Sequence, residues 1–189
     1  MPRLFTALEI PRDAALSLSL LRGGLPGARW VDVENYHLTL AFLGAVAEDA
    51  MGSVRSAADN VSAACLSNSE LGVLEVTLDQ INFWHKPQIL CATASRESPL
   101  AIELAETLKR HLINAGFTPD LKTFRAHVTL ARKVARVKVP PHVEAVRVAF
   151  RDFSLVESRS GPGGSIYSVI DSWPLCARAL SNENTLKNT

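Results

Sequence analysis

The stretch His37-Leu38-Thr39-Leu40-Ala41 recurs ninety residues later as His127-Val128-Thr129-Leu130-Ala131, with four of the five residues identical. Each copy lies in an apolar, β-branched setting, which predicts a β-strand. Successive side chains of a strand point to opposite faces, so the His and Thr of each copy share one face. If the apolar faces pack into a core, the two copies present paired imidazoles and paired hydroxyls to one groove.

This pairing suits chemistry at a phosphorus atom. Histidine has an unperturbed pKa of about 6.5 and can either accept or donate a proton near neutral pH. One imidazole can take a proton from an attacking water or hydroxyl while the other protonates the leaving oxygen. The threonine hydroxyls can hydrogen-bond the non-bridging phosphoryl oxygens. The scheme calls for no metal ion and no cofactor, and the residues alone leave open which histidine is the acid.

The residues around both copies resemble a known family. The segments His37-Leu-Thr-Leu-Ala-Phe-Leu-Gly44 and Ala126-His-Val-Thr-Leu-Ala-Arg132 are similar to the two-histidine (2H) phosphoesterases, and above all to the RNA 2′,3′-cyclic phosphodiesterases, also called the 2′-5′ RNA ligase family. The ends of the chain, residues 3–11 and 167–175, resemble that family too, so the likeness covers nearly the whole sequence. One departure is Ala126, where the family often has proline.

The resemblance implies an enzyme that hydrolyses a 2′,3′-cyclic phosphate at an RNA end to a 2′-phosphate, without metal. It implies that His37 is the proton donor and His127 the proton acceptor. The expected partners are therefore RNA ends or small cyclic nucleotides.

The resemblance also implies substrate contacts by Arg132 and Tyr167, in addition to Thr39 and Thr129. Arg132 is five residues from His127, an odd separation that places it on the opposite strand face unless the strand ends or bulges. Arg125 shares the parity of His127 and is a comparable candidate from the residues alone.

Three rival hypotheses stay open. The same groove could act on another small cyclic nucleotide or a 2′-5′ linked oligonucleotide, or catalyse the reverse ligation of RNA ends. A binding module could hold an RNA end through these side chains without turnover. Both motifs could also be ordinary strand residues, although their repetition argues against this.

The composition indicates one globular unit. The chain has 189 residues, 47% of them hydrophobic, and a formal net charge of +1, so an anionic ligand must be bound by local charges. We expect residues 1–180 to form a single bilobal domain and the polar residues 181–189 a flexible tail. Three scattered cysteines, Cys65, Cys91 and Cys176, predict no disulfide framework. No signal peptide and no membrane-spanning run is visible, so we expect a cytoplasmic protein that does not bind membranes. We also expect a monomer.

Hydrophobic periodicity predicts an α+β fold of two similar lobes, each an antiparallel sheet backed by helices, related by a pseudo-two-fold axis around a central cleft. Helices are expected at 12–22, 47–65 and 98–116, and strands at 4–10, 37–44, 73–78, 88–94 and 127–132. The apolar positions change parity between Phe150 and Phe153, which predicts a bulge or a break near Arg151.

The loops offer weaker signals. Phe83 and Trp84 are expected in a loop ending at Pro87, where they could stack a nucleobase beside Lys86 or pack against the core. The basic loop 133–146 could steer an anionic substrate or simply be solvated. The glycine-rich segment 161–164 is a turn, since no Lys-Ser/Thr pair or helix follows it. His85, His111 and His142 lack the spacing of metal ligands.

Overall fold

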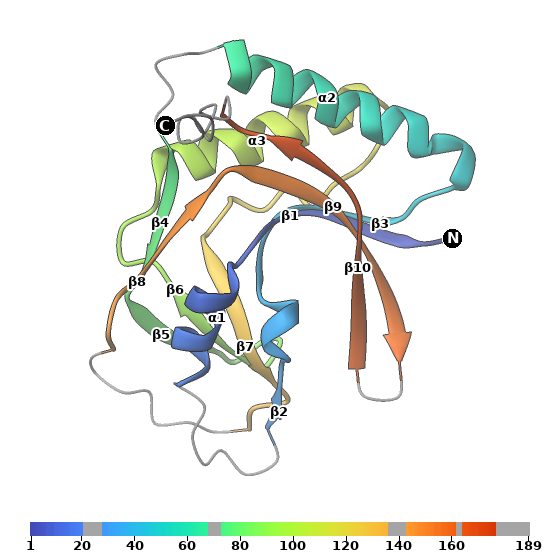
Figure 1. Cartoon of the computed structure of the whole chain (residues 1–189). Helices are drawn as coiled ribbons and strands as arrows, with labels where there is room; N and C mark the ends of the chain where they lie inside the picture. The colour runs from blue at the N-terminus through green and yellow to red at the C-terminus, as the bar shows by residue number, and fades with distance from the viewer. Residues whose placement is uncertain (21–27, 68–72, 136–142, 162–163, 177–189) are drawn as a thin grey trace, which may run out of the picture.

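The computed structural model describes residues 1–20, 28–67, 73–135, 143–161 and 164–176. The predicted tail at 181–189 lies outside these residues. The fold is α+β, as the periodicity indicates, and two long helices lie side by side over a large antiparallel sheet (Figure 1). The elements are β1 (Arg3–Glu9), α1 (Arg12–Ser19), β2 (Arg29–Trp30), η1 (Val33–Asn35), β3 (His37–Ala45), η2 (Glu48–Ala50), α2 (Met51–Ser67), β4 (Leu74–Leu78), β5 (Gln80–Trp84), β6 (Ile89–Thr93), α3 (Pro99–Asn114), β7 (His127–Arg132), β8 (Val146–Phe150), β9 (Asp152–Gly161) and β10 (Gly164–Pro174).

The large sheet is arranged symmetrically about its two central strands. Among the described residues its order is β10-β9-β1-β3-β7-β6-β5, with β2 also paired to β7 and with β4 and β8 forming a separate two-stranded sheet. The strands that carry the repeated motif, β3 and β7, are neighbours. One wing of the sheet holds β1, β9 and β10, and the other holds β6 and β5. This is the predicted arrangement of two similar lobes.

The two motif strands also pair with their outer neighbours in the same register. On β1, Glu9 lies opposite His37 and Ala7 opposite Thr39. On β6, Thr93 lies opposite His127 and Cys91 opposite Thr129. In both cases the register then shifts, between Thr6 and Ala7 of β1 and between Leu90 and Cys91 of β6. Each motif strand therefore carries a β-bulge at the same place, directly after its threonine.

The two halves of the sheet meet at a single pair. Leu38 of β3 pairs with Val128 of β7, and beyond this pair the edge of β7 is taken over by β2, whose Arg29 and Trp30 pair with Arg132 and Ala131. The strands β3 and β7 thus diverge from one joint, and the two wings open away from each other (Figure 1).

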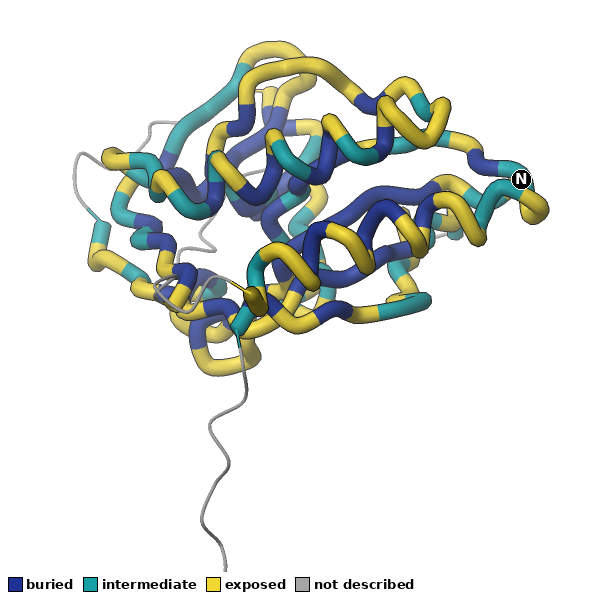
Figure 2. The backbone as a smooth tube through the Cα atoms, turned by 90° about the horizontal axis from the view of Figure 1, so that it is seen from above, coloured by how far each residue is buried: buried dark blue, intermediate teal, exposed yellow. Residues whose placement is uncertain are grey.

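The core lies between the sheet and the long helices. The apolar residues of both motifs are buried, and Leu38, Val128 and Leu130 have no exposed surface. Buried positions recur between exposed ones along the long helices in the view from above (Figure 2), as expected for amphipathic helices. The helix α3 packs against β3, and α2 packs against both α3 and β10. Both helices therefore cover one face of the sheet, and the other face is left for the polar motif residues.

Polar contacts fix α2 on β10. The indole Nε1 of Trp173 donates to Asp59 at 2.6 Å, and the Ser62 hydroxyl donates to the Pro174 carbonyl at 2.7 Å. An ion pair joins Arg55 to Asp171 at 2.8 Å. These contacts hold the C-terminal strand, which carries Tyr167, in a fixed relation to the helical layer.

One sequence prediction is wrong: Phe83 and Trp84 are not in a loop but on β5, which pairs with β6. The break that was one of the two alternatives near Arg151 is confirmed, because β8 pairs with β4, whereas β9 pairs with β1 and β10. The apolar positions change parity because the chain passes from the two-stranded sheet to the large sheet at this point.

Among the described residues, no helix is both long enough and apolar enough to cross a membrane.

Candidate functional site

The joint between β3 and β7 sets the geometry of the repeated histidines and threonines. Continuing the antiparallel register by one residue on each side of the Leu38–Val128 pair places His37 across from Thr129 and Thr39 across from His127. The two histidines are then diagonal neighbours, whose Cβ atoms lie somewhat less than about 7–8 Å apart in a regular pairing. The charge of His127 acts on His37, in keeping with this placement. The four predicted side chains are all half-buried and lie on the face opposite the buried Leu38 and Val128.

Both imidazoles are held by the same local hydrogen bond. The Nδ1 of His37 lies 2.7 Å from the carbonyl oxygen of Asn35, and the Nδ1 of His127 lies 2.7 Å from the carbonyl oxygen of Arg125. A carbonyl only accepts, so each Nδ1 carries the hydrogen and donates it. The proton chemistry is therefore left to Nε2 of each ring, at matched positions in the two halves.

Aromatic side chains flank each imidazole. The ring centroid of His37 lies 4.8 Å from that of Phe5 and 5.1 Å from that of Tyr167, which meets it edge-on. On the other side, the centroids of Trp84 and His127 are 4.7 Å apart. Because β5 is a strand, Phe83 points the other way and packs partly against the core. One residue of the aromatic pair thus reaches the site and its neighbour does not.

Both histidines are less basic than a free imidazole. Burial lowers the pKa of His37 to about 4, helped by the positive charges of His127 and Arg132 and opposed by the hydrogen bond to Asn35. Burial also lowers the pKa of His127, with Arg125 and Arg132 acting in the same direction. The hydrogen bond to the Arg125 carbonyl and the nearby charge of Glu97 oppose that shift. Without a ligand, both rings are neutral at pH 7.

Arg132 is close enough to both histidines for its charge to act on them, and β7 has the bulge that the parity argument allowed as an exception. The Arg132 side chain is half-buried like His127 and Thr129, and its charge lowers the pKa of both histidines. The reason is the bulge in β7: from Thr129 to Ala131 the strand advances two residues while β6 advances one, which exchanges the faces beyond that point. The Arg125 side chain is exposed, and its carbonyl orients the His127 ring.

The two threonines differ in their surroundings. Thr129 makes a side-chain hydrogen bond with Cys91, the residue opposite it on β6. Burial raises the pKa of the Cys91 thiol to about 12, although the hydrogen bond with Thr129 and the charge of Arg132 act in the opposite direction, so this group stays protonated. Thr39 lies opposite Ala7, which has no polar side chain.

A groove of about 600 Å³ extends from His127 and Thr39 along the sheet. His37 lines a separate, smaller recess of about 60 Å³, together with Tyr167, Glu9 and Glu34. The residues lining the groove combine aromatic and basic side chains with one acid: Thr39, Leu40, Ala41, Phe42, Trp84, Pro87, Ile89, Lys109, Asp120, Lys122, Thr123, Phe124, Arg125 and His127.

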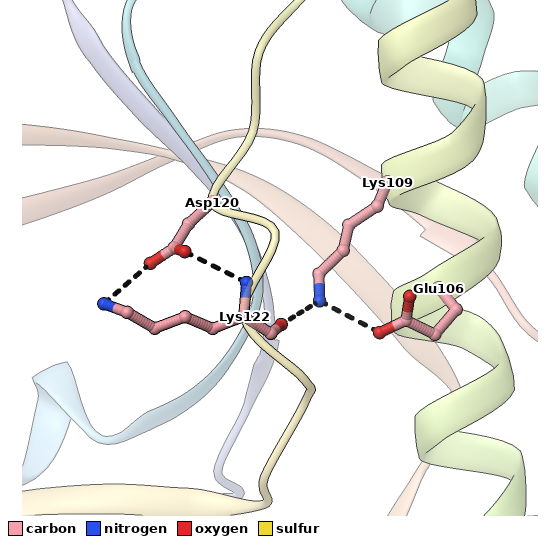
Figure 3. Close-up of polar contacts among 4 residues, drawn as sticks. All are labelled: Glu106, Lys109, Asp120 and Lys122. Atoms are coloured by element: carbon pink, nitrogen blue, oxygen red, sulfur yellow. Dashed lines mark hydrogen bonds and ion pairs between the residues drawn. The ribbon is translucent and has the colours of Figure 1, made fainter.

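A buried lysine anchors one wall of the groove. Lys109 of α3 has a side chain only 6% exposed, and its Nζ donates to the Lys122 carbonyl at 2.6 Å and to Glu106 at 3.0 Å (Figure 3). Lys122 in turn forms an ion pair with Asp120 at 3.2 Å. The backbone N–H of Asp120 donates to the Phe42 carbonyl at 3.2 Å. The segment that leads into β7 is therefore tied to both α3 and β3.

Sequence reasoning missed some of the surroundings of the site. Phe5 was expected only as part of a buried strand, yet its ring packs against His37. Glu97, which acts on His127, precedes a helix in a polar segment that carries no motif, so no sequence signal identifies it. Tyr36, the residue before His37, is buried in the core.

The part of the chain that the structure describes has no cluster of three or more His, Cys, Asp and Glu side chains placed to hold a metal ion. Its three cysteines are free thiols.

Known proteins are similar to this chain in both sequence and fold. An RNA 2′,3′-cyclic phosphodiesterase of Escherichia coli K12 is 25% identical over 177 residues, which cover 92% of this chain and 96% of that protein. Proteins of the same name from Archaeoglobus fulgidus and Bacillus subtilis are 28% and 31% identical, over 87% and 70% of this chain and 96% and 72% of theirs. A crystal structure of E. coli LigT with 3′-AMP superposes with a TM-score of 0.77 at 24% identity, covering 92% of this chain and 98% of the other. A crystal structure of a Thermus thermophilus protein has a TM-score of 0.75 at 25% identity, covering 92% and 97%.

The family model described as LigT like Phosphoesterase matches residues 8–84 and 94–167, which include both motif strands, both bulges and the two flanking rings of Trp84 and Tyr167. The chain therefore belongs to the LigT-like phosphoesterase family.

Proposed function

We propose that the protein hydrolyses the 2′,3′-cyclic phosphate at the end of an RNA to a 2′-phosphate, with His37 as the general acid and His127 as the general base. The observation that carries the proposal is the matched pair of imidazoles, each oriented through Nδ1 and placed on either side of the joint between β3 and β7. The relatives named RNA 2′,3′-cyclic phosphodiesterase support the choice of substrate.

The proposed step is an in-line displacement. A water oxygen forms a bond to phosphorus as the bond to O3′ breaks, and the phosphate stays on O2′. The water proton passes to Nε2 of His127, and Nε2 of His37 gives its proton to the departing O3′. The low pKa of His37 makes its protonated form a strong acid, and the bound phosphate anion favours the proton that this ring carries.

The remaining polar groups fit roles around the phosphoryl oxygens. The guanidinium of Arg132, near both histidines, can hold a non-bridging oxygen through charge-assisted hydrogen bonds. The hydroxyls of Thr39 and Thr129 lie on the same sheet face and can donate to the other oxygen. Tyr167 borders the His37 recess and Trp84 the groove, where their rings can bound the ribose and the base.

The test is an assay of the purified chain on a short RNA ending in a 2′,3′-cyclic phosphate. We expect a 2′-phosphate product, identified by its resistance to enzymes that act on 3′-phosphates. Formation of a 3′-phosphate, or tight binding without turnover between pH 5 and 8, would contradict the proposal. A 2′-5′ linked oligonucleotide and a pair of ligatable RNA ends, assayed with the same preparation, measure the rival reactions.

Activity is expected to survive chelation. The proposed proton transfers use side chains only, so dialysis against EDTA should leave the rate within about twofold of its starting value. Loss of a catalytic Lewis acid would lower the rate far more, because such an ion stabilises the transition state by several kcal/mol. The measurement is the initial rate before and after dialysis, with zinc or magnesium added back. Loss of activity on dialysis and recovery with either ion would reject the metal-free mechanism.

Removal of a threonine hydroxyl should cost less than removal of a histidine. In Thr39→Val and Thr129→Val the side-chain shape is nearly kept, and one hydrogen bond to a charged phosphoryl oxygen is lost, worth about 1–3 kcal/mol or roughly 5- to 150-fold in kcat/KM. Steady-state kinetics on the cyclic substrate measure the loss. Ser168→Ala, an exposed change on β10, is the control. Unchanged kinetics in both valine variants would contradict a role for the threonine hydroxyls in binding the phosphoryl oxygens.

The expected monomer and its expected cytoplasmic location stay predictions. Light scattering after size-exclusion chromatography measures the first.

A further inference from the structure

The two halves of the site differ in how the residue before each histidine is held. Before His37, the N–H of Tyr36 donates to the carbonyl oxygen of Val33 at 3.1 Å, within the turn of η1. Before His127, the N–H of Ala126 donates to the side-chain Oε2 of Glu97 at 3.0 Å. The backbone N–H of the residue before the histidine is therefore bound by a neutral carbonyl in one half and by a carboxylate in the other. A proline at position 126 would have no N–H for this bond.

Glu97 lies in the connection between β6 and α3, next to the start of β7. It follows β6, whose last residue, Thr93, lies opposite His127, and it precedes α3. Ala126 is buried and Glu97 is half-buried, so the bond between them is partly shielded from water. A charge-assisted bond of this kind is stronger than one between neutral groups.

The charges around the two histidines are correspondingly unequal. Arg125, Arg132 and Glu97 act on His127, and Glu97 is the one negative charge among them. The charges acting on His37 are those of His127 and Arg132, both positive. Glu9 and Glu34 line the recess beside His37 but are exposed to water, and neither contributes to its shift.

We propose that Glu97 is a positioning residue for the proposed base: its carboxylate holds the backbone at the start of β7 and stabilises the imidazolium that His127 becomes when it takes a proton from water. Glu97 then distinguishes two histidines that the repeated sequence makes alike. This inference rests on the proposed function only in naming His127 as the base. The electrostatic pairing of Glu97 with His127 can be measured without substrate.

The experiment compares E97Q with E97A in the full chain. Glutamine keeps an oxygen acceptor for the Ala126 N–H and removes the charge, whereas alanine removes both. NMR titration of the imidazole Cε1–H signals should show the pKa of His127 falling in E97Q, because the opposing negative charge is gone. E9Q, which removes the carboxylate opposite the other histidine, is the matched control and should leave the pKa of His127 unchanged.

Kinetics on the cyclic substrate supply a second readout. In E97Q we expect kcat to fall on the order of tenfold at pH 7 with little change in KM, because a charge-stabilised interaction with the imidazolium is lost. E97A should fall further, since the backbone anchor is lost as well. Thermal unfolding of each variant verifies that it is folded.

The outcomes separate the two proposals. An unchanged pKa of His127 in folded E97Q overturns the role of Glu97, whatever the activity. A lowered pKa in a protein that does not turn over the cyclic phosphate keeps the Glu97–His127 pairing and rejects the proposed function. An equal loss of kcat in E97Q and E97A assigns the effect to charge alone and rejects the backbone anchor.

Discussion

His37→Ala and His127→Ala should each lower turnover of a 2′,3′-cyclic phosphate by roughly a hundred- to ten-thousand-fold, the usual range for loss of a positioned proton-transfer group. In the proposed mechanism each imidazole carries the proton on its own side of the phosphorus, one from β3 and one from β7, next to the Leu38–Val128 pair. The measurement is single-turnover kinetics with enzyme in excess, which separates chemistry from product release.

A double variant tests whether the two histidines act as a unit. If both belong to one displacement, the loss in His37→Ala/His127→Ala should be far smaller than the product of the two single losses. His85→Ala is the control, because this exposed histidine packs against Phe83 and not against either motif. Near-normal hydrolysis by either single variant, in a folded protein of verified purity, would refute the mechanism.

The rate should depend steeply on pH. In the proposed mechanism the free enzyme holds a proton on His37 and none on His127, and both have a pKa below 6.5, that of His37 about 4. Above 6.5 the protonated fraction of His37 falls tenfold per pH unit, so kcat/KM at pH 8.5 should be about 100-fold lower than at pH 6.5. On acidification kcat/KM rises, levels off between the two pKa values, and falls only below the lower of them, where both rings are protonated.

Comparison of kcat with kcat/KM sharpens this test. The profile of kcat reports the enzyme–substrate complex, in which the phosphate anion raises the pKa of both imidazoles. The descending limb of kcat should therefore lie at higher pH than that of kcat/KM. A kcat/KM that is constant from pH 6.5 to 8.5 would show that no histidine needs a proton before substrate binds.

The repeated motif made the fold and the histidine pairing predictable, because alternation along a strand is a short-range rule. His37 and Thr39 share a face for the same reason as His127 and Thr129, and the outer strands confirm this by pairing with both copies in the same register. The sequence concealed β5, because Asn82 within the strand and His85 just after it are typical of a loop, although Phe83 and Trp84 pair across to β6.

The contributions of Arg132 and Glu97 depend on features that a single sequence does not display. The bulge after Thr129 changes the face of every later residue in β7, and only the pairing with β6 reveals it. Glu97 reaches Ala126 across 29 positions of sequence, so its role depends on how α3 and β7 pack together. Local patterns predict which side chains share a strand face, whereas tertiary packing decides which distant charges act on them.

One rung of backbone, Leu38 with Val128, joins the two wings of the sheet, and neither side chain has any surface in contact with water. Both side chains belong to the core beneath the helices, on the face opposite the histidines. In the proposed mechanism, apolar packing on that face therefore sets the separation of the two imidazoles. We expect a change in the shape of either side chain to alter the rate without altering any reacting atom.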